Sequence, residues 1–214
     1  LDLPDGPLRV RGRIDRVDLL DSGDLQCLRV IDYKLGGKAA SLSEMYYGQQ
    51  LQLLTYLCAA LNIKPGFEPA AALYFAVKDP VIDAGILNED QIERERVKLL
   101  RMSGLVVNDP RMIELTAARP DEAIPIRFTN AGTPQRADWL VSSEELDLLM
   151  ERARELICEI ASDIRRGVTD ITPSISENRS ACDYCDYRGI CQFVPTLPGA
   201  RVRKLEKLSA QDVL

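Results

Sequence analysis

Asp15, Asp32 and Lys34 are the first candidates for a reactive site in this chain. The two aspartates stand on either side of Gly23-Asp24, in the run VRGRIDRVDLLDSGDLQCLRVIDYK at residues 10–34. Gly-Asp is among the dipeptides that close a two-residue hairpin loop, so Asp15 should face Asp32 across two antiparallel strands. Side chains alternate with a period of two along a strand, which brings Lys34 to the same face as Asp32.

Two carboxylates directly opposed across a sheet repel each other unless a cation lies between them. Mg²⁺ is commonly held by one or two carboxylates together with a substrate phosphate, and Mn²⁺ also takes carboxylate ligands. We therefore interpret Asp15 and Asp32 as ligands of Mg²⁺ or Mn²⁺, with Lys34 positioning or activating the attacking water. The alternative is an ordinary salt-bridged surface hairpin, because so short a motif as Asp-x-Lys often matches by chance.

The hairpin register also predicts an apolar face next to these charges. Four side chains should share that face with the aspartates: Val17 opposite Val30, and Leu19 opposite Leu28. Later in the chain, the apolar run AAALYFAVK at residues 70–78 predicts a strand in the middle of the sheet.

One helix should join the hairpin to that strand. Ser41-x-x-Glu44 is a capping box, and the helix should run to about Leu61. Gln49, Gln52 and Tyr56 interrupt its apolar surface at helical spacing, and polar groups on a buried stripe need partners. We expect these partners to be waters of the metal site or a phosphate backbone, although a buried hydrogen-bonded Gln and Tyr would also fit.

GRIDRVD, VIDYK and Gln52-x-x-x-Tyr56 together resemble the core of the PD-(D/E)xK nucleases, in particular their RecB-like branch. The resemblance implies a restriction-endonuclease-like α/β fold, with a mixed central sheet flanked by helices. It also implies that Asp15 and Asp32 are the metal ligands, that Lys34 is the catalytic lysine, and that Gln52 and Tyr56 belong to the same catalytic motif.

The second half of the chain should contain an insertion and a long helix. We expect the insertion at about 79–141, with a helix beginning near Asn88 and a second hairpin around 131–134. Ser142-x-x-Glu145 should cap the last helix, which ends at Arg165-Arg166-Gly167. Its apolar stripe should pack on the core: Leu146, Leu149, Met150, Ala153, Ile157, Ile160 and Ile164.

Three cysteines follow, at Cys182, Cys185 and Cys191. The spacing C-x2-C-x5-C is typical of a metal or a cluster, although zinc and [4Fe-4S] sites normally take four ligands. Three unrelated cysteines are one alternative, and a zinc-ribbon binding protein is another that leaves the hairpin unexplained. We expect a nuclease core over 1–170 and a cysteine-rich tail over 171–214.

ACDYCDYRGICQF, following a RecB-like core, resembles the carboxy-terminal nuclease domains of the AddB family. The resemblance implies a [4Fe-4S] cluster completed by a cysteine far upstream, which this chain lacks, so we expect an incomplete cluster here. It further implies hydrolysis of single-stranded DNA in double-strand break repair, an AddA-type helicase-nuclease partner and the bacterial cytoplasm. The competing hypothesis is an inactive DNA-binding or subunit-docking module that keeps the fold.

Composition narrows the possible chemistry. The chain of 214 residues contains no histidine, which excludes His-based triads, His zinc ligands and His general bases. Its net charge is −6, so DNA binding must be local, and Arg9, Arg11, Arg13 and Arg16 form a basic strip or an ordinary charged strand edge. We find no apolar run of membrane-spanning length and no signal peptide, and interpret the start at Leu1 as a cut from a longer protein.

Overall fold

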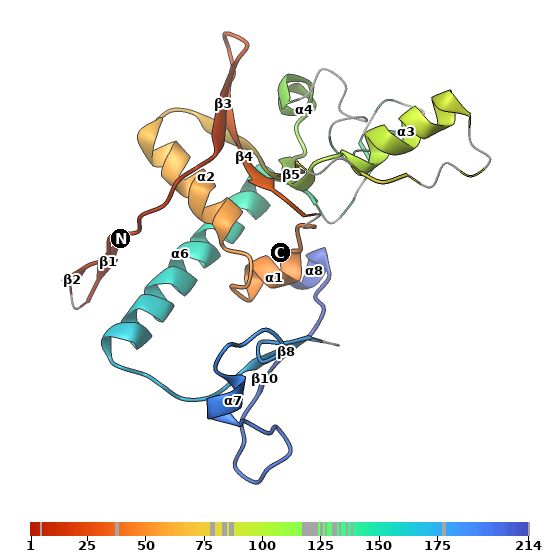
Figure 1. The fold of residues 1–214 in the computed structure, drawn as a ribbon. Helices are drawn as coiled ribbons and strands as arrows, with labels where there is room; N and C mark the ends of the chain where they lie inside the picture. The colour runs from red at the N-terminus through yellow and green to blue at the C-terminus, as the bar shows by residue number, and fades with distance from the viewer. Residues whose placement is uncertain are drawn as a thin grey trace.

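A five-stranded mixed sheet forms the centre of the computed structural model (Figure 1). Two helices pack on one face of the sheet, and a tail with a small sheet of its own follows the longer helix. The structure describes residues 1–4, 6–36, 39–77, 80–82, 85, 88–116, 124, 126, 128–129, 132, 134–135, 137, 139–176 and 179–213.

The sheet has the spatial order β3, β4, β5, β6, β7. Neighbouring pairs alternate between antiparallel and parallel, beginning with the antiparallel hairpin of β3 and β4. The expected mixed α/β architecture is therefore confirmed, with the buried strand β5 in the middle. The strand bounds are β3 Arg16–Asp21, β4 Gln26–Lys34, β5 Glu68–Ala76, β6 Ser103–Val107 and β7 Leu140–Val141.

The hairpin has the predicted register, with Val17 opposite Val30 and Leu19 opposite Leu28. Gly23 in its loop has φ 89°, a conformation that glycine adopts without a steric penalty. The expected apolar face is only half buried: Leu28 and Val30 on β4 are covered, whereas Val17 and Leu19 on β3 are exposed. The reason is that β3 is the edge strand, while the covering helix packs on β4 and β5.

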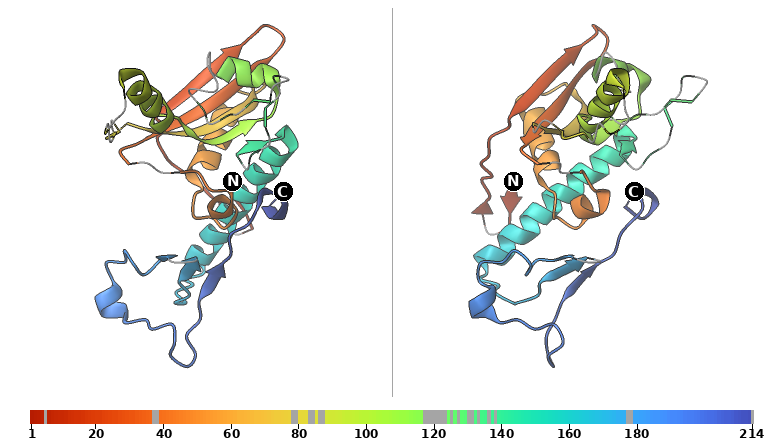
Figure 2. Two further views of the ribbon diagram at one scale, coloured as in Figure 1. Left: turned by 90° about the vertical axis from the view of Figure 1, so that its right-hand side faces the viewer. Right: turned by 45° about the vertical axis from the view of Figure 1, so that its right-hand side comes forward.

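Helices α2 (Gln52–Ile63) and α6 (Ser143–Arg165) pack against each other beneath one face of the sheet (Figure 2). The crossover from β4 through α2 to the parallel strand β5 is a βαβ unit. The largest buried side chains of this layer include Leu28, Met45, Leu53, Leu54, Leu57, Leu105 and Leu146.

The predicted single helix over residues 41–61 is wrong, because the segment folds as two helices. Helix α1 (Leu42–Tyr46) begins at the predicted Ser41 cap, and the chain then turns at Gly48, which has φ 85°. Gln50 is buried in this turn, where its Oε1 accepts the Ser41 N–H and its Nε2 donates to the Ala39 carbonyl and to the Glu44 carboxylate. The Ser41 N–H thus bonds to Gln50 instead of to the Glu44 side chain, as a full capping box would require. Helix α2 then begins separately at Gln52.

The opposite face of the sheet carries helix α4 (Pro110–Thr116) and a second apolar cluster. Helix α3 (Glu89–Leu99) starts from the predicted Asn88 cap and lies away from the sheet (Figure 1). The expected hairpin around 131–134 falls largely outside the described residues, apart from an antiparallel bridge between Phe128 and Pro134.

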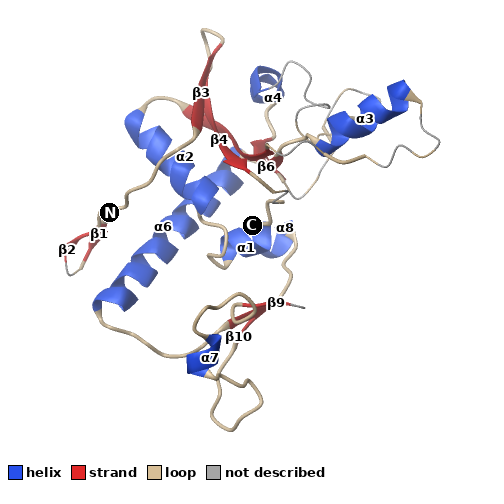
Figure 3. Cartoon of the chain, in the orientation of Figure 1, coloured by secondary structure: helices blue, strands red, loops and turns tan. Residues whose placement is uncertain are grey.

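Helix α6 has the predicted capping box at Ser142 and Glu145, and Gly167 follows its end with φ 68°. Four residues of the predicted stripe pack into the core as expected: Leu146, Leu149, Met150 and Ala153. Ile160 and Ile164 do not, because the second half of α6 extends past the sheet, and their side chains are exposed (Figure 3). No described helix is long and apolar enough to cross a membrane.

The tail forms a three-stranded sheet that is separate from the central one. Leu208 fastens it to α1, because the Leu208 N–H donates to Ser43 Oγ at 2.8 Å and the Ser43 hydroxyl donates to the Leu208 carbonyl at 3.0 Å. A short strand pair lies at the other end of the chain, formed by β1 (Asp2–Leu3) and β2 (Gly6–Pro7). The tail elements are β8 Ser174–Ser176, β9 Arg179–Ser180, α7 Arg188–Cys191, β10 Arg203–Leu205 and α8 Ala210–Val213.

Candidate active site

Asp32 and Lys34 lie together at the carboxyl end of β4. Asp32 is 3% exposed, and Lys34 Nζ lies 2.5 Å from its Oδ2. Both residues project from the same face of the strand, as the period of two predicts. The face is the one that α2 covers, so this charged pair lies at the edge of the main core.

Gln52 connects this pair to helix α2. Its Oε1 accepts a hydrogen bond from Lys34 Nζ at 2.7 Å, and its Nε2 donates to Asp32 Oδ1 at 2.9 Å. Nε2 also donates to the Tyr56 hydroxyl at 3.1 Å, one helical turn further on. Because α2 returns antiparallel to β4, its first residue lies above the carboxyl end of that strand. Gln52 and Tyr56 are therefore bonded to protein side chains, as in the alternative of a hydrogen-bonded Gln and Tyr, and their expected contact with water or phosphate stays a prediction.

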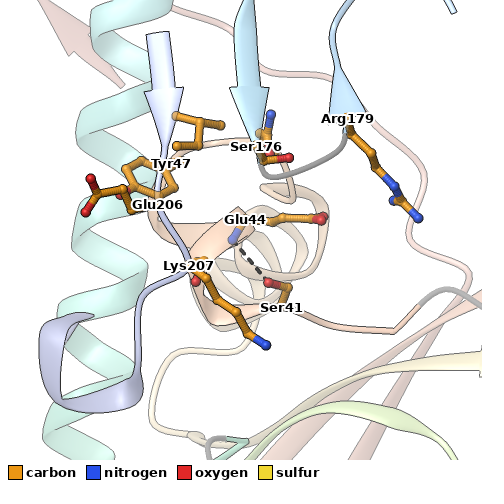
Figure 4. Close-up of a pocket in the computed structure, with 10 residues that line it drawn as sticks. Ser41, Glu44, Tyr47, Ser176, Arg179, Glu206 and Lys207 are labelled. Carbon is orange, nitrogen blue, oxygen red and sulfur yellow. Dashed lines mark hydrogen bonds between the residues drawn. The ribbon is translucent and has the colours of Figure 1, made fainter. Parts of the chain in front are cut away.

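Gln49 does not join this site. The prediction that it shares one helical stripe with Gln52 and Tyr56 is therefore wrong. It lies in the turn between α1 and α2 and lines a cavity of about 390 Å³ between α1 and the tail (Figure 4). Ser176, Arg179 and Lys207 come into the same cavity from the tail. The break at Gly48 turns Gln49 away from the helical face that Gln52 occupies.

The predicted pairing of Asp15 with Asp32 across the hairpin is wrong. The regular ladder of the hairpin ends at Arg16 and Ile31, one pair before Asp15 and Asp32. In an uninterrupted ladder the Tyr33 N–H would bond to the Ile14 carbonyl, but it donates to Asp15 Oδ2 at 3.0 Å. The Asp15 carboxylate is thus fixed to the backbone of the residue that follows Asp32, and its side chain is exposed.

These carboxylates fit a hard divalent cation. Asp32 Oδ2 is buried and, among the described residues, receives no hydrogen bond, so its contact is the ion pair with Lys34. A buried carboxylate oxygen of this kind is a ready ligand. The described residues contain no cluster of three or more Cys, Asp or Glu side chains placed to hold a metal. Asp15 and Asp32 could hold Mg²⁺ or Mn²⁺ only together with water or substrate oxygens, as is usual for Mg²⁺.

Tyr74 is a member of the site that the sequence did not reveal. It lies beside Asp32 on the parallel strand β5, is 2% exposed, and has Lys34 Nζ 5.3 Å from its ring centroid. Burial, reinforced by the nearby Asp32 carboxylate, raises the pKa of Tyr74 to about 12. Only the register between β4 and β5 identifies this neighbour, and the sequence does not give that register.

The basic strip next to the hairpin has three exposed arginines and one arginine in an ion pair. Arg9, Arg11 and Arg13 are exposed. Arg16 instead bonds to Asp18 at 2.7 Å, and this hydrogen bond, with a weaker one to the Tyr33 hydroxyl, raises the pKa of the Arg16 guanidinium.

The cysteines of the tail lie on a turn and a short helix. Cys185 N–H donates to the Cys182 carbonyl at 3.4 Å, and Cys191 ends α7, where its N–H donates to the Tyr187 carbonyl at 2.8 Å. All three thiols are free, and Cys185 and Cys191 are exposed. The sequence prediction that these cysteines hold a cluster stays a prediction.

The family model for the PD-(D/E)XK nuclease superfamily matches residues 1–192. The chain is also similar to proteins named as the B subunits of ATP-dependent helicase/deoxyribonucleases. It is 35% identical to that of Desulforudis audaxviator over 217 residues, 37% to that of Moorella thermoacetica over 221 and 35% to that of Clostridium perfringens over 225. These matches cover 97%, 97% and 100% of this chain, but the chain spans only 19% of each relative's length. The chain therefore belongs to the PD-(D/E)XK nuclease superfamily.

Proposed function

We propose that this chain is the metal-dependent deoxyribonuclease domain of a bacterial helicase-nuclease complex. In the complete protein it would act as an exonuclease on single-stranded DNA during end resection and recombinational repair, in the cytoplasm. An AddA-type helicase-nuclease is the expected partner, since the relatives are named as subunits of a helicase/deoxyribonuclease. The observation that carries this proposal is the bonded cluster that Lys34 and Gln52 form around the buried Asp32.

Each residue of the cluster has a distinct part in phosphodiester hydrolysis. Asp15 and Asp32 would hold Mg²⁺ or Mn²⁺, which polarises the phosphate and lowers the pKa of water when bound. Lys34 brings a positive charge to the same spot, where it can orient the attacking water and offset the charge that develops on the phosphate oxygens. Gln52 fixes both Asp32 and Lys34, and Tyr56 fixes Gln52 in turn.

The tail has an architectural part in this proposal. In the full-length protein, Cys182, Cys185 and Cys191 would supply three of the four thiolate ligands of a [4Fe-4S] cluster. The core over 1–170 would carry the chemistry, and the tail over 171–214 would be held to it at α1, where Ser43 and Leu208 exchange two hydrogen bonds.

The test is cleavage of an end-labelled single-stranded oligonucleotide by the purified chain and by the full-length protein. We expect degradation in Mg²⁺ or Mn²⁺, none in EDTA, and none for Asp32→Asn. Asp147→Asn makes the same chemical change at an exposed position on α6 and should cleave like the wild type. Equal cleavage by Asp32→Asn and the wild-type protein would contradict the proposal. Wild-type binding of DNA without any cleavage would instead favour an inactive docking module.

A further inference from the structure

A groove of about 720 Å³ lies between the segment 8–14 and the two helices α2 and α6. The segment 8–14 forms one wall and continues directly into Asp15. Exposed apolar side chains contribute to its surface, with Val10 52% and Ile63 71% exposed.

The charge of the groove is opposite to that of the chain. Arg9, Arg11 and Arg154 line it, and no acidic residue lines it within the part of the chain that the structure describes, although the net charge of the chain is −6. Arg9 and Arg11 are exposed and form no ion pair within the described part of the chain. Arg154 bonds to Glu151 at 3.1 Å, so the two arginines of the segment 8–14 carry most of the available positive charge. A local basic groove in an acidic chain indicates a polyanionic ligand.

The groove shares one residue, Tyr56, with the candidate active site. Tyr56 lines the groove with its ring, while its hydroxyl accepts the hydrogen bond from Gln52. A Cβ added to Gly12 would lie 3.4 Å from Tyr56 Cε1, so the segment 8–14 passes against this ring. A ligand in the groove would therefore lie next to the side chain that fixes Gln52, close to Asp15 at the end of the same segment.

We propose that this groove binds the sugar-phosphate backbone of the single strand on one side of the scissile bond. Arg9 and Arg11 contact successive phosphates, and Val10 and Ile63 lie against sugars and bases. Single-stranded nucleic acids are bound in this manner, by a positively charged groove that also offers apolar or aromatic surface. This inference rests on the proposed function, because the strand in the groove is the substrate of the neighbouring site.

Binding is measured separately from cleavage by fluorescence anisotropy of a labelled oligothymidylate in EDTA, over a series of salt concentrations. The double variant Arg9→Glu/Arg11→Glu should bind at least about tenfold more weakly, and its salt slope should fall by about 1.4 for two lost phosphate contacts. The matched control is Arg94→Glu/Arg188→Glu, which changes the charge equally at exposed positions on α3 and α7. This control should keep most of the wild-type affinity and the wild-type salt slope.

Cleavage measurements then test the proposed groove separately from the proposed nuclease function. For an active protein, Arg9→Glu/Arg11→Glu should raise KM for a long single strand by far more than it lowers kcat. If Arg9→Glu/Arg11→Glu keeps the wild-type affinity and salt slope, or if the control variant loses as much, the proposal that the groove binds DNA is wrong. The nuclease assignment would remain intact. Absence of cleavage by the wild-type protein, with binding that depends on Arg9 and Arg11, would refute the nuclease assignment and retain the groove.

Discussion

Lys34 places its ammonium 2.5 Å from Oδ2 of Asp32, two residues earlier on the same strand. A divalent cation bound through this oxygen would have to share it with the Lys34 ammonium. If Lys34 leaves Oδ2 for the cation, two neighbours can hold it nearby: Gln52 Oε1 at 2.7 Å and the Tyr74 ring at 5.3 Å. In the proposed function, Lys34 would therefore compete with the metal for Asp32, in addition to its proposed part in catalysis.

Lys34→Met should separate these two roles. Without the competing ammonium, the affinity for Mn²⁺ should rise about tenfold, equivalent to ~1.4 kcal/mol, while DNA cleavage is lost. Electron paramagnetic resonance of Mn²⁺ titrations measures the affinity without depending on activity. Weaker Mn²⁺ binding by Lys34→Met would show that Lys34 supports the metal instead of competing with it.

Gln52→Glu should impair catalysis by changing the hydrogen bonds that hold Asp32 and Lys34 in place. The glutamate can still accept from Lys34, but it cannot donate to Asp32 and Tyr56, and it adds a negative charge beside Asp32. We expect kcat for single-stranded DNA to fall by about 100-fold, a loss of ~2.7 kcal/mol in transition-state stabilisation. Gln49→Glu makes the same substitution at the exposed turn before α2 and is the matched control. Equal kcat values for the two variants would remove Gln52 from the site.

Local rules of sequence predicted much of this structure. Gly23 and its loop set the hairpin register, and with it the placement of Asp32 and Lys34 on one face. The capping box at Ser142 and Glu145 placed the start of α6 correctly. These features depend on neighbours within a few residues, and the local pattern contains all the information they need.

Features that depend on distant contacts were not predictable in this way. Gln50 lay within the single helix predicted from Ser41 to about Leu61, yet it is buried in a turn, where it bonds to Ala39, Ser41 and Glu44. Tyr74 joins the site only through the register of β4 with β5. Ile160 looked like a core residue from its spacing, but the sheet ends before the helix does.

Asp18→Asn should weaken the hairpin and change its response to acid. Burial raises the pKa of the Asp18 carboxyl, but hydrogen bonds from Arg16 and Arg29 outweigh burial and lower the pKa overall. A lowered pKa means that the stabilisation is present at neutral pH and is lost as the pH falls below the ordinary aspartate range. We expect a loss of about 1.5–3 kcal/mol at pH 7, because the substitution removes charged hydrogen bonds to a partly buried Arg29.

Urea denaturation at several pH values measures this effect. The free energy of unfolding of Asp18→Asn should vary less than that of the wild type between pH 5 and pH 3, a window set by the aspartate pKa of roughly 4. Asp147→Asn, at an exposed position on α6, should keep the wild-type stability and pH profile. Identical profiles for Asp18→Asn and the wild type would mean that the ion pair with Arg29 contributes nothing to stability.

The cysteine tail leads to the last prediction, which is that this chain by itself does not retain a complete [4Fe-4S] cluster. Cys182, Cys185 and Cys191 offer three thiolates, and such clusters normally take four. Cys27 and Cys58 are poor substitutes because both are buried in the main core, where burial raises the pKa of each thiol. Iron and sulfide analysis of anaerobically purified protein should therefore give fewer than four irons per chain.

A longer protein of the proposed kind provides the comparison, since the proposed upstream cysteine would supply the fourth ligand. It should show the visible absorbance of a cluster, and Cys185→Ser should remove that absorbance. Should the chain of 214 residues hold four irons, a fourth ligand must come from within it. Cys158 on α6 would then be the first residue to replace, because it is less buried than Cys27 and Cys58. Loss of iron in Cys158→Ser would identify it as that ligand and overturn the requirement for an upstream cysteine.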